Sequence, residues 1–207
     1  PAAGDRVTLP EGYPALPEPL PSPVVDSHCH LDIGASGRDG EAGIGVGTAL
    51  AAAEAAGVDA VVQVGVDVPS SEEAVRLAGE WPRIVAALAL HPNEAPRIHA
   101  DRGVEALQEA WRRIAELARG ERVVAVGETG MDFFRTDAAG RAAQEESFRV
   151  HIRLAKELDK ALVIHDRDAH TAILRVMDDE GAPRRVVMHC FSGDADFARE
   201  VVARGWF

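Results

Sequence analysis

The chain has 207 residues, of which 46% are hydrophobic and 27% charged, a balance typical of a soluble globular protein and not of a disordered chain. Its 34 acidic and 22 basic side chains give a formal net charge of −12, which disfavours a protein that holds nucleic acid by long-range electrostatic attraction. No apolar run reaches the roughly 20 residues of a membrane helix and no secretory signal is recognisable, so we expect a cytoplasmic protein with no membrane partner, and we infer no obligate protein partner.

Proline is concentrated at the N-terminus, where seven of the 12 prolines lie within residues 1–23. Proline is incompatible with a helix interior, so residues 1–23 are predicted to form an extended N-terminal segment that wraps the domain. The folded domain is expected to begin at residue 24 and to run to residue 207.

From Val24 onward, short apolar runs alternate with longer helical patterns. Strands are predicted at residues 23–28, 59–66, 83–90, 122–128, 161–165 and 185–190, and helices at residues 45–56, 70–80, 103–118, 141–159, 168–180 and 194–204. The strands are continuously apolar, which indicates burial on both faces. Strands and helices in strict alternation predict an α/β fold with a parallel sheet and right-handed crossovers.

The six predicted strands are fewer than a closed parallel barrel requires. A TIM-type (β/α)8 barrel has eight strands and typically about 250 residues. The chain ends on Gly205-Trp206-Phe207, which resembles the opening of a seventh strand and would leave an unpaired apolar edge. We therefore expect a (β/α)8 barrel that is C-terminally incomplete, truncated after about six βα units.

Histidines gather at the C-terminal ends of the predicted strands. His28 and His30 end the first strand, and His91 follows the third. Glu128 ends the fourth strand, while His165 and His189 end the fifth and sixth. In a parallel barrel all these ends open on one face, so these side chains are expected to converge on one mouth.

Several imidazoles and a carboxylate in one mouth suit a divalent transition metal, and a carboxylate can bridge two ions. Any one of these histidines alone is more readily explained as a hydrogen-bonded structural residue, but together they favour metal binding. Asp26 could orient an imidazole or could bond a nearby backbone amide.

The remaining histidines and the cysteines receive structural interpretations. His99 is predicted to lie in a loop, and His151 and His170 in helices, each with a surface or hydrogen-bonded role. Cys29 and Cys190 form no CxxC pair, so we interpret them as buried free thiols.

Five segments in this order resemble the TatD-like metal-dependent hydrolases, deoxyribonucleases of the amidohydrolase superfamily. They are DSHCHLD (26–32), LHP (90–92), VGETGMDFF (126–134), IHDRDAH (164–170) and MHCFSG (188–193). The stretch 144–169 is also similar to the family's helix leading into its fifth strand. The resemblance runs from about Asp26 to the last residue.

The resemblance implies a site for two divalent metal ions, Mg, Mn or Zn. In this reading His28 and His30 hold the first ion, and Glu128 bridges to a second ion held by His165 and His189. The family completes its first site with an aspartate from the eighth strand, which this sequence does not reach.

The resemblance also suggests roles for residues around the ions. Glu128 and His165 are the catalytic candidates, and His91, Asp132 and Arg167 are the candidates for substrate binding. Asp166 and Asp168 match positions that line or brace the pocket. Phe133 and Phe134 stand where the family often has tyrosine.

The sequence hypothesis is therefore a metal-dependent phosphodiester hydrolase with 3′-exonuclease character, acting on single-stranded DNA ends. In one alternative the metal site is the same but the enzyme hydrolyses a different bond, as in a small-molecule amidohydrolase or phosphoesterase. The superfamily members that bridge two metals with a carboxylated lysine are a poor match, because the two lysines, Lys156 and Lys160, lie away from the metal-facing strand ends. A further alternative is a metal-binding fragment without activity.

Overall fold

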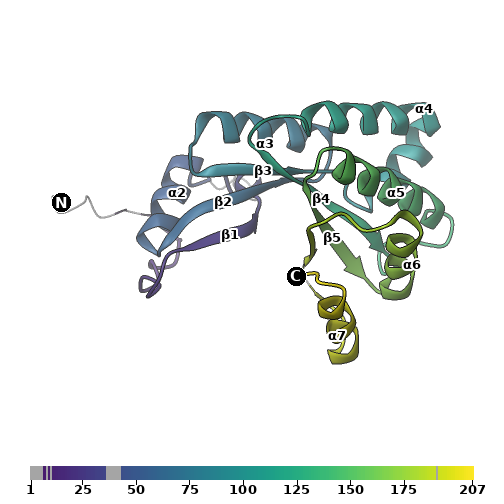
Figure 1. Ribbon diagram of the computed structural model, residues 1–207. Helices are drawn as coiled ribbons and strands as arrows, with labels where there is room; N and C mark the ends of the chain where they lie inside the picture. Colours follow the sequence, from purple (N-terminus) through teal and green to yellow (C-terminus); the bar gives the residue numbers. More distant parts are fainter. Residues whose placement is uncertain (1–6, 8, 10, 36–42, 190) are drawn as a thin grey trace.

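The computed structural model describes residues 7, 9, 11–35, 43–189 and 191–207. Its centre is a six-stranded parallel sheet whose strands pair in the order in which they occur along the chain. The strands are β1 (Val24–Cys29), β2 (Val58–Gly65), β3 (Ile84–Leu88), β4 (Val123–Asp132), β5 (Ala161–Arg167) and β6 (Val186–His189). The sheet curls strongly (Figure 1), so the fold is an α/β half-barrel, as the strand pattern predicts.

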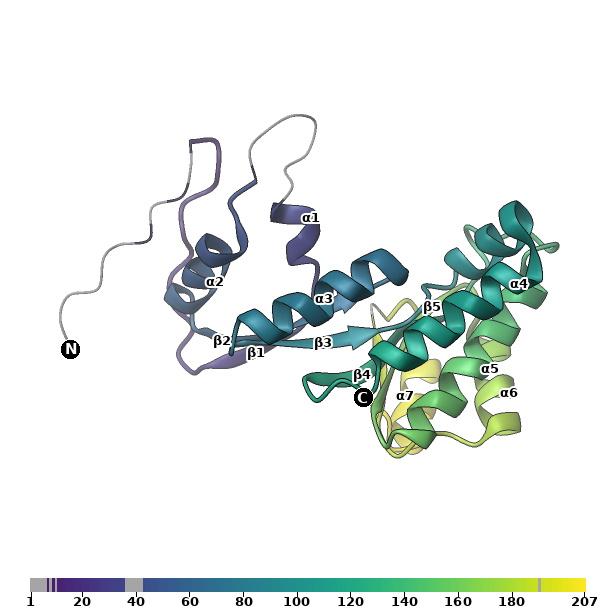
Figure 2. The same cartoon turned by 90° about the horizontal axis from the view of Figure 1, so that it is seen from above.

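Helices connect the strands and cover the outer side of the curled sheet. They are α1 (Leu31–Ala35), α2 (Val46–Ala55), α3 (Val68–Glu80), α4 (Glu94–Leu117), α5 (Arg141–Glu157), α6 (His170–Glu180) and α7 (Ala195–Ala203). Helix α3 packs on β2 and β3, and α5 packs on β4 and β5. Figure 2 shows α3 and α4 lying across the outer side of the strands.

The core has an outer and an inner part. Most buried apolar side chains fill the space between the strands and the outer helices, with Phe148, Ile152 and Ile164 among the largest that are fully buried. A small cluster lies on the opposite, inner face of the sheet and consists of Val64, Ala87, Ala125 and Val163. Because strand residues alternate between faces, His165 lies on the same face of β5 as Val163. The inner face therefore changes from apolar to polar toward the C-terminal strand ends.

Strand β4 is longer than the sequence pattern predicts, and Glu128 lies inside it instead of at its end. The prediction ended this strand at Glu128, but pairing with β5 continues from Thr129 opposite Ile164 to Asp132 opposite Arg167. Glycine permits this close passage: a Cβ on Gly130, whose φ is 135°, would lie 2.2 Å from the carbonyl oxygen of His165. Glycine in this segment therefore serves close strand packing.

Helix α4 corrects a second expectation. The segment before residue 103 was predicted to be a loop, yet the helix begins at Glu94 and continues to Leu117, with a kink at Gly103 where φ is 84°. Pro96 lies in the first turn. Backbone N–H groups in the first turn have no intrahelical acceptor, so a proline there costs the helix no hydrogen bond. His99 is consequently an exposed residue of a helix and not of a loop.

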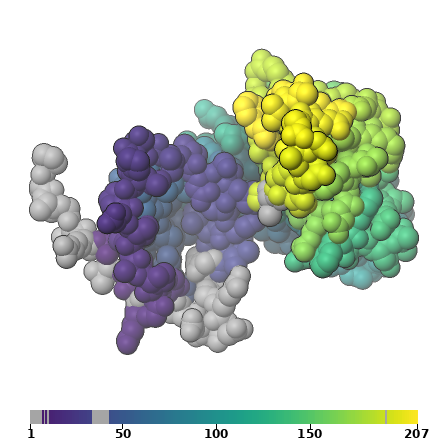
Figure 3. All heavy atoms as spheres, turned by 90° about the horizontal axis from the view of Figure 1, so that it is seen from below, coloured from purple at the N-terminus to yellow at the C-terminus, as the bar shows by residue number. Residues whose placement is uncertain are grey.

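Backbone hydrogen bonds tie both terminal segments to the domain. Residues 11–23 contain neither helix nor strand, and the Leu20 amide donates to the Ala56 carbonyl. At the other end the Phe207 amide donates to Val186 and the Phe207 carbonyl accepts from Met188, which is the pairing of a parallel strand alongside β6. The N-terminal and C-terminal parts lie on opposite sides of the molecule (Figure 3). No helix in the described ranges is long and apolar enough to cross a membrane.

Candidate metal centre

The Glu128 carboxylate, from β4, faces four imidazoles that come from four different parts of the barrel. Oε1 lies 3.9 Å from Nε2 of His28 and 3.9 Å from Nε2 of His91. Oε2 lies 3.4 Å from Nδ1 of His165 and 3.4 Å from Nε2 of His189. The structure thus brings together residues that are up to 161 positions apart, counted from His28 to His189.

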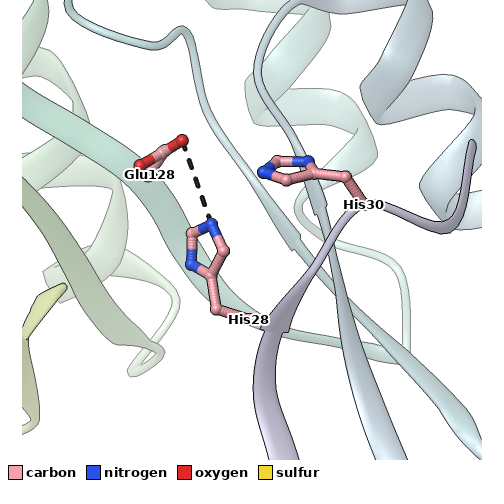
Figure 4. A group of neighbouring side chains, drawn as sticks. All are labelled: His28, His30 and Glu128. Carbon is pink, nitrogen blue, oxygen red and sulfur yellow. Dashed lines mark ion pairs between the residues drawn. The ribbon is translucent and has the colours of Figure 1, made fainter. Parts of the chain in front are cut away.

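A first group of possible metal ligands consists of His28, His30 and Glu128, each of which offers an atom within 4.8 Å of the others. Figure 4 shows both imidazoles reaching from the end of β1 toward the carboxylate on β4. Nδ1 of His30 lies 3.0 Å from the Val64 carbonyl oxygen, which can only accept a hydrogen bond. His30 therefore donates through Nδ1 and keeps Nε2 as a free lone pair, the form that binds a metal.

A second group consists of His91, Glu128 and His165, again with ligand atoms within 4.8 Å of one another. His165 turns Nδ1 toward Glu128, while its Nε2 lies 3.3 Å from Oδ2 of Asp132. This is the arrangement in which a carboxylate behind a histidine sets its tautomer and orientation. The sequence interpretation placed His91 near the substrate, whereas in the structure it lies close enough to Glu128 to be a third donor.

His189 lies close to Glu128 but belongs to neither three-residue group among the described residues. Its ring stacks on that of His28, with centroids 3.6 Å apart and an interplanar angle of 4°. These residues belong to β1 and β6, the two outer strands of the six-stranded sheet. The stack therefore shows how far the sheet curls: its two edges approach each other at the C-terminal strand ends.

The ionisation states of this cluster suit a divalent cation. Burial lowers the pKa of both His28 and His91 to about 4, and burial also lowers that of His189. Burial alone would raise the pKa of Glu128, but the surrounding histidines favour its ionised form and lower the pKa to about 2. At neutral pH Glu128 is ionised, and these three imidazoles are neutral, as metal ligands must be.

Asp132 is anchored by a buried polar network that sequence reasoning missed. Oδ1 accepts from the Arg135 amide at 2.8 Å, and Oδ2 accepts from Nδ2 of Asn93 at 3.4 Å. The Gln144 side chain bonds both backbone groups of Asp132 and donates to Oγ1 of Thr136. Burial favours the neutral acid, but the bonds from Arg135 and Asn93 keep the pKa of Asp132 below its usual value. Asp132, predicted to bind substrate, is 1% exposed and lies behind His165.

A second missed residue, Gln63 on β2, fixes the segment that follows His30. Its Oε1 accepts from the Leu31 amide at 2.7 Å, and its Nε2 donates to Oδ1 of Asp32 at 2.7 Å. Gln63 is fully buried. The available signal was a lone glutamine inside the apolar run VVQVGV, because a buried amide must find partners.

Other predicted residues lie around the cluster. The Arg167 guanidinium packs over the Phe134 ring, and Asp166 points away from the inner face, with Oδ2 2.6 Å from Nδ1 of His170. Asp26 accepts from the His28 backbone amide at 3.1 Å, which is the second of its two proposed roles. Cys29 is a free, half-buried thiol that donates to the Val62 carbonyl, and Cys190 lies outside the described residues.

The donor set fits a divalent metal on structural grounds. Nδ1 of His28 is buried without a hydrogen-bond partner among the described residues, so this nitrogen is available to a ligand. His30 and His165 each bond a protein oxygen on the side away from Glu128, which leaves their other nitrogens directed at the cluster. Imidazole and carboxylate together are ligands for zinc or manganese.

Comparisons with known proteins give matches over most of the chain. The family model described as TatD related DNase matches residues 25–207. A Mycobacterium tuberculosis protein named uncharacterized metal-dependent hydrolase TatD is 43% identical over 189 residues, covering 88% of this chain and 66% of the relative. The 3′-5′ ssDNA/RNA exonuclease TatD of Citrobacter rodentium is 34% identical over 160 residues, covering 76% of this chain and 57% of the relative.

A solved structure gives the same result for the fold. The crystal structure of the TatD homologue YjjV from Escherichia coli matches with a TM-score of 0.71 and 30% identity, covering 88% of this chain and 65% of that chain. The chain thus spans somewhat less than two thirds of the length of these relatives.

Proposed function

This chain belongs to the family of TatD-related DNases, and from that premise we propose that it is a metal-dependent hydrolase that cleaves phosphodiester bonds at the 3′ ends of single-stranded DNA. The observation that carries the proposal is the position of Glu128, whose two carboxylate oxygens face different pairs of histidines. A carboxylate placed in this way can be shared by two ions.

In this proposal His28, His30 and Glu128 hold one divalent ion. Glu128 and His165 hold a second ion together with a third ligand. This ligand is either His189, as the family pattern implies, or His91, whose ligand atom lies within 4.8 Å of those of Glu128 and His165. Two such ions, when bound, polarise phosphoryl oxygens and lower the pKa of water toward neutrality. Asp132 holds the His165 ring in place.

The charge of the chain supports an end-acting enzyme. A net charge of −12 opposes the binding of a long polyanion, whereas two divalent cations neutralise one or two phosphates locally. The named activity of the Citrobacter rodentium relative, 3′-5′ exonuclease on ssDNA or RNA, agrees with this substrate class.

A second candidate keeps the metal centre but assigns a small-molecule ester or amide as the substrate. It is favoured by the Mycobacterium tuberculosis relative, which at 43% identity carries only the name of a metal-dependent hydrolase. Both candidate functions require Glu128. They are therefore distinguished by the substrate that is hydrolysed, because the metal site is the same in both.

The test is hydrolysis of a 5′-labelled single-stranded oligonucleotide with EDTA, Mg²⁺, Mn²⁺ or Zn²⁺. The variants compared are Glu128→Gln, which keeps the side-chain shape, and Glu109→Gln, an exposed control on α4. Metal-dependent shortening from the 3′ end, lost only in Glu128→Gln, is the expected result. Failure of every metal to support cleavage of DNA or RNA by a protein that binds metal would overturn the nuclease proposal in favour of a small-molecule hydrolase.

A further inference from the structure

The rim of the metal centre carries an arginine stacked on an exposed aromatic ring. The guanidinium carbon of Arg167 lies 4.0 Å from the centroid of the Phe134 ring. Phe134 is 63% exposed, whereas its neighbour Phe133 packs against the buried core. A single exposed phenylalanine needs no explanation, but an arginine guanidinium positioned over its ring creates a cationic aromatic surface.

Strand geometry places this pair next to the metal centre. Arg167 follows His165 by two residues on β5, so both side chains lie on the same face of the strand, roughly 6–7 Å apart along it. Asp166, between them, is buried toward the opposite side and bonds His170. The Phe133 amide donates to the Arg167 carbonyl at 2.9 Å, which holds the residues after β4 beside the end of β5.

The charge of Arg167 is available to a ligand. Many of the arginines on the helices pair with carboxylates, as Arg149 and Arg153 do with Glu180. In the described part of the chain, by contrast, no carboxylate lies within ion-pair distance of Arg167, and the guanidinium contacts the Phe134 ring. An unpaired guanidinium beside a site for phosphate-neutralising cations suits an anionic substrate with a flat group to stack.

We propose that Phe134 and Arg167 form a stacking platform for the base of a nucleotide next to the scissile phosphate. This inference rests on the proposed function and specifies its substrate. The sugar separates a base from its phosphate, so a phosphate at the Glu128 cluster requires its base several ångströms away, which is where the next inward-facing residue of β5 lies. Aromatic and arginine surfaces bind bases of any sequence, because every base has a π face.

The kinetic test compares a normal oligonucleotide with two that are abasic on one or the other side of the scissile phosphate. Phe134→Ala should lower kcat/KM on the normal substrate by roughly tenfold, mainly through KM. The wild-type preference for the normal substrate over one abasic substrate should largely disappear in this variant. Val202→Ala on α7, at an apolar residue that is 70% exposed, is the matched control and should keep the preference.

Arg167→Lys separates stacking from charge. Lysine keeps the positive charge but lacks the planar guanidinium, so a lysine variant that loses the base preference supports the platform. A preference for the normal substrate that stays at the wild-type value in Phe134→Ala would overturn the inference while leaving the nuclease activity intact. A wild-type protein that cleaves no oligonucleotide would instead overturn the proposed function.

A binding measurement tests the platform without turnover. An oligonucleotide with 2-aminopurine near its 3′ end and phosphorothioate linkages, which slow hydrolysis, should lose fluorescence on binding to the wild type, because stacking quenches this base. Phe134→Ala should bind with less quenching at saturation, and Val202→Ala should quench as the wild type does. Equal quenching in all three proteins would contradict the platform.

Discussion

Asp132 and His165 meet at 3.3 Å through Oδ2 and Nε2, on the side of the imidazole opposite the nitrogen that faces Glu128. An ionised carboxylate only accepts hydrogen bonds, so Nε2 carries a proton toward Asp132, and Nδ1, which faces Glu128, is the nitrogen that can offer a lone pair to a metal. A residue that shares no strand with His165 thereby sets its tautomer. Asp132 is in turn held by the Arg135 amide and the Asn93 side chain.

Asp132→Asn should weaken metal binding without removing a ligand. The amide keeps the size of the carboxylate but no longer fixes the His165 tautomer, so we expect a loss of roughly 10- to 100-fold in affinity for Mn²⁺ or Zn²⁺. Calorimetric titration of the metal measures this loss. Asp101→Asn, an exposed change on α4, should bind metal as the wild type does. Wild-type affinity in Asp132→Asn would show that the carboxylate does not orient the ring.

Gln63→Leu should destabilise the segment that follows His30. The change leaves the Leu31 amide and the Asp32 carboxylate without their bonds to Gln63, at a cost of about 1–3 kcal/mol in the free energy of unfolding. Urea unfolding measures this cost, and metal titration should show weaker binding at His30. Gln108→Leu on the exposed side of α4 is the control. Equal stability of the two variants would refute the role of Gln63.

Glycine substitutions at two positions should have opposite effects. A Cβ at Gly130 would lie 2.2 Å from the His165 carbonyl oxygen at a φ of 135°, so Gly130→Ala should destabilise by more than about 2 kcal/mol and displace His165. Gly79 is helical with nothing within 4 Å of an added Cβ, so Gly79→Ala should stabilise by about 0.5–1 kcal/mol. Thermal unfolding compares them, and a stable Gly130→Ala would contradict the close strand contact.

His151 should make the fold sensitive to acid. It is fully buried in α5, where its Nε2 accepts from the Leu90 amide at 3.2 Å and its Nδ1 lies 2.7 Å from the Ser147 carbonyl. Burial lowers its pKa from 6.5 to about 4. Between these values the unfolded chain binds a proton that the folded protein does not, so stability falls as the pH drops from about 6.5 to about 4.

At pH 5 this residue should cost on the order of 2 kcal/mol of stability relative to pH 7. The check is urea unfolding at both values for the wild type and His151→Gln, since the difference between the two proteins removes the contribution of the other titrating groups. His99→Gln, at an exposed position of α4, should retain the wild-type pH dependence. An unchanged slope in His151→Gln would show that His151 is not the responsible group.

The sequence predicted the strand order and the residues of the cluster because both depend on local patterns. Apolar runs followed by His28, His165 or His189 are readable without a structure, and the parallel fold then places their ends together. The family assignment, made from five motifs, is confirmed by the family model. The first half of α4 was missed because Pro96 resembles a helix breaker when the position of the first turn is not known.

What the sequence could not provide is the side of each ring that faces the cluster. The contacts of His30 with Val64 and of His165 with Asp132 join residues more than 30 positions apart, and they depend on strand register. The same holds for the approach of His91 to Glu128, which makes His91 a candidate ligand as well as a substrate contact. The ring nitrogen that faces the cluster and the histidine that approaches Glu128 depend on three-dimensional distances, which the spacing of residues along the sequence does not predict.

The most direct test of the account is the location of bound metal by anomalous X-ray diffraction from crystals of the protein grown with Mn²⁺. Two peaks are expected, both within coordination distance of Glu128, one beside His28 and His30 and the other beside His165. The third donor of the second ion, His91 or His189, would be visible in the same map. A map with no ion at Glu128, or with Mn²⁺ bound only elsewhere, would contradict the proposal that this carboxylate is the centre of a two-metal hydrolase.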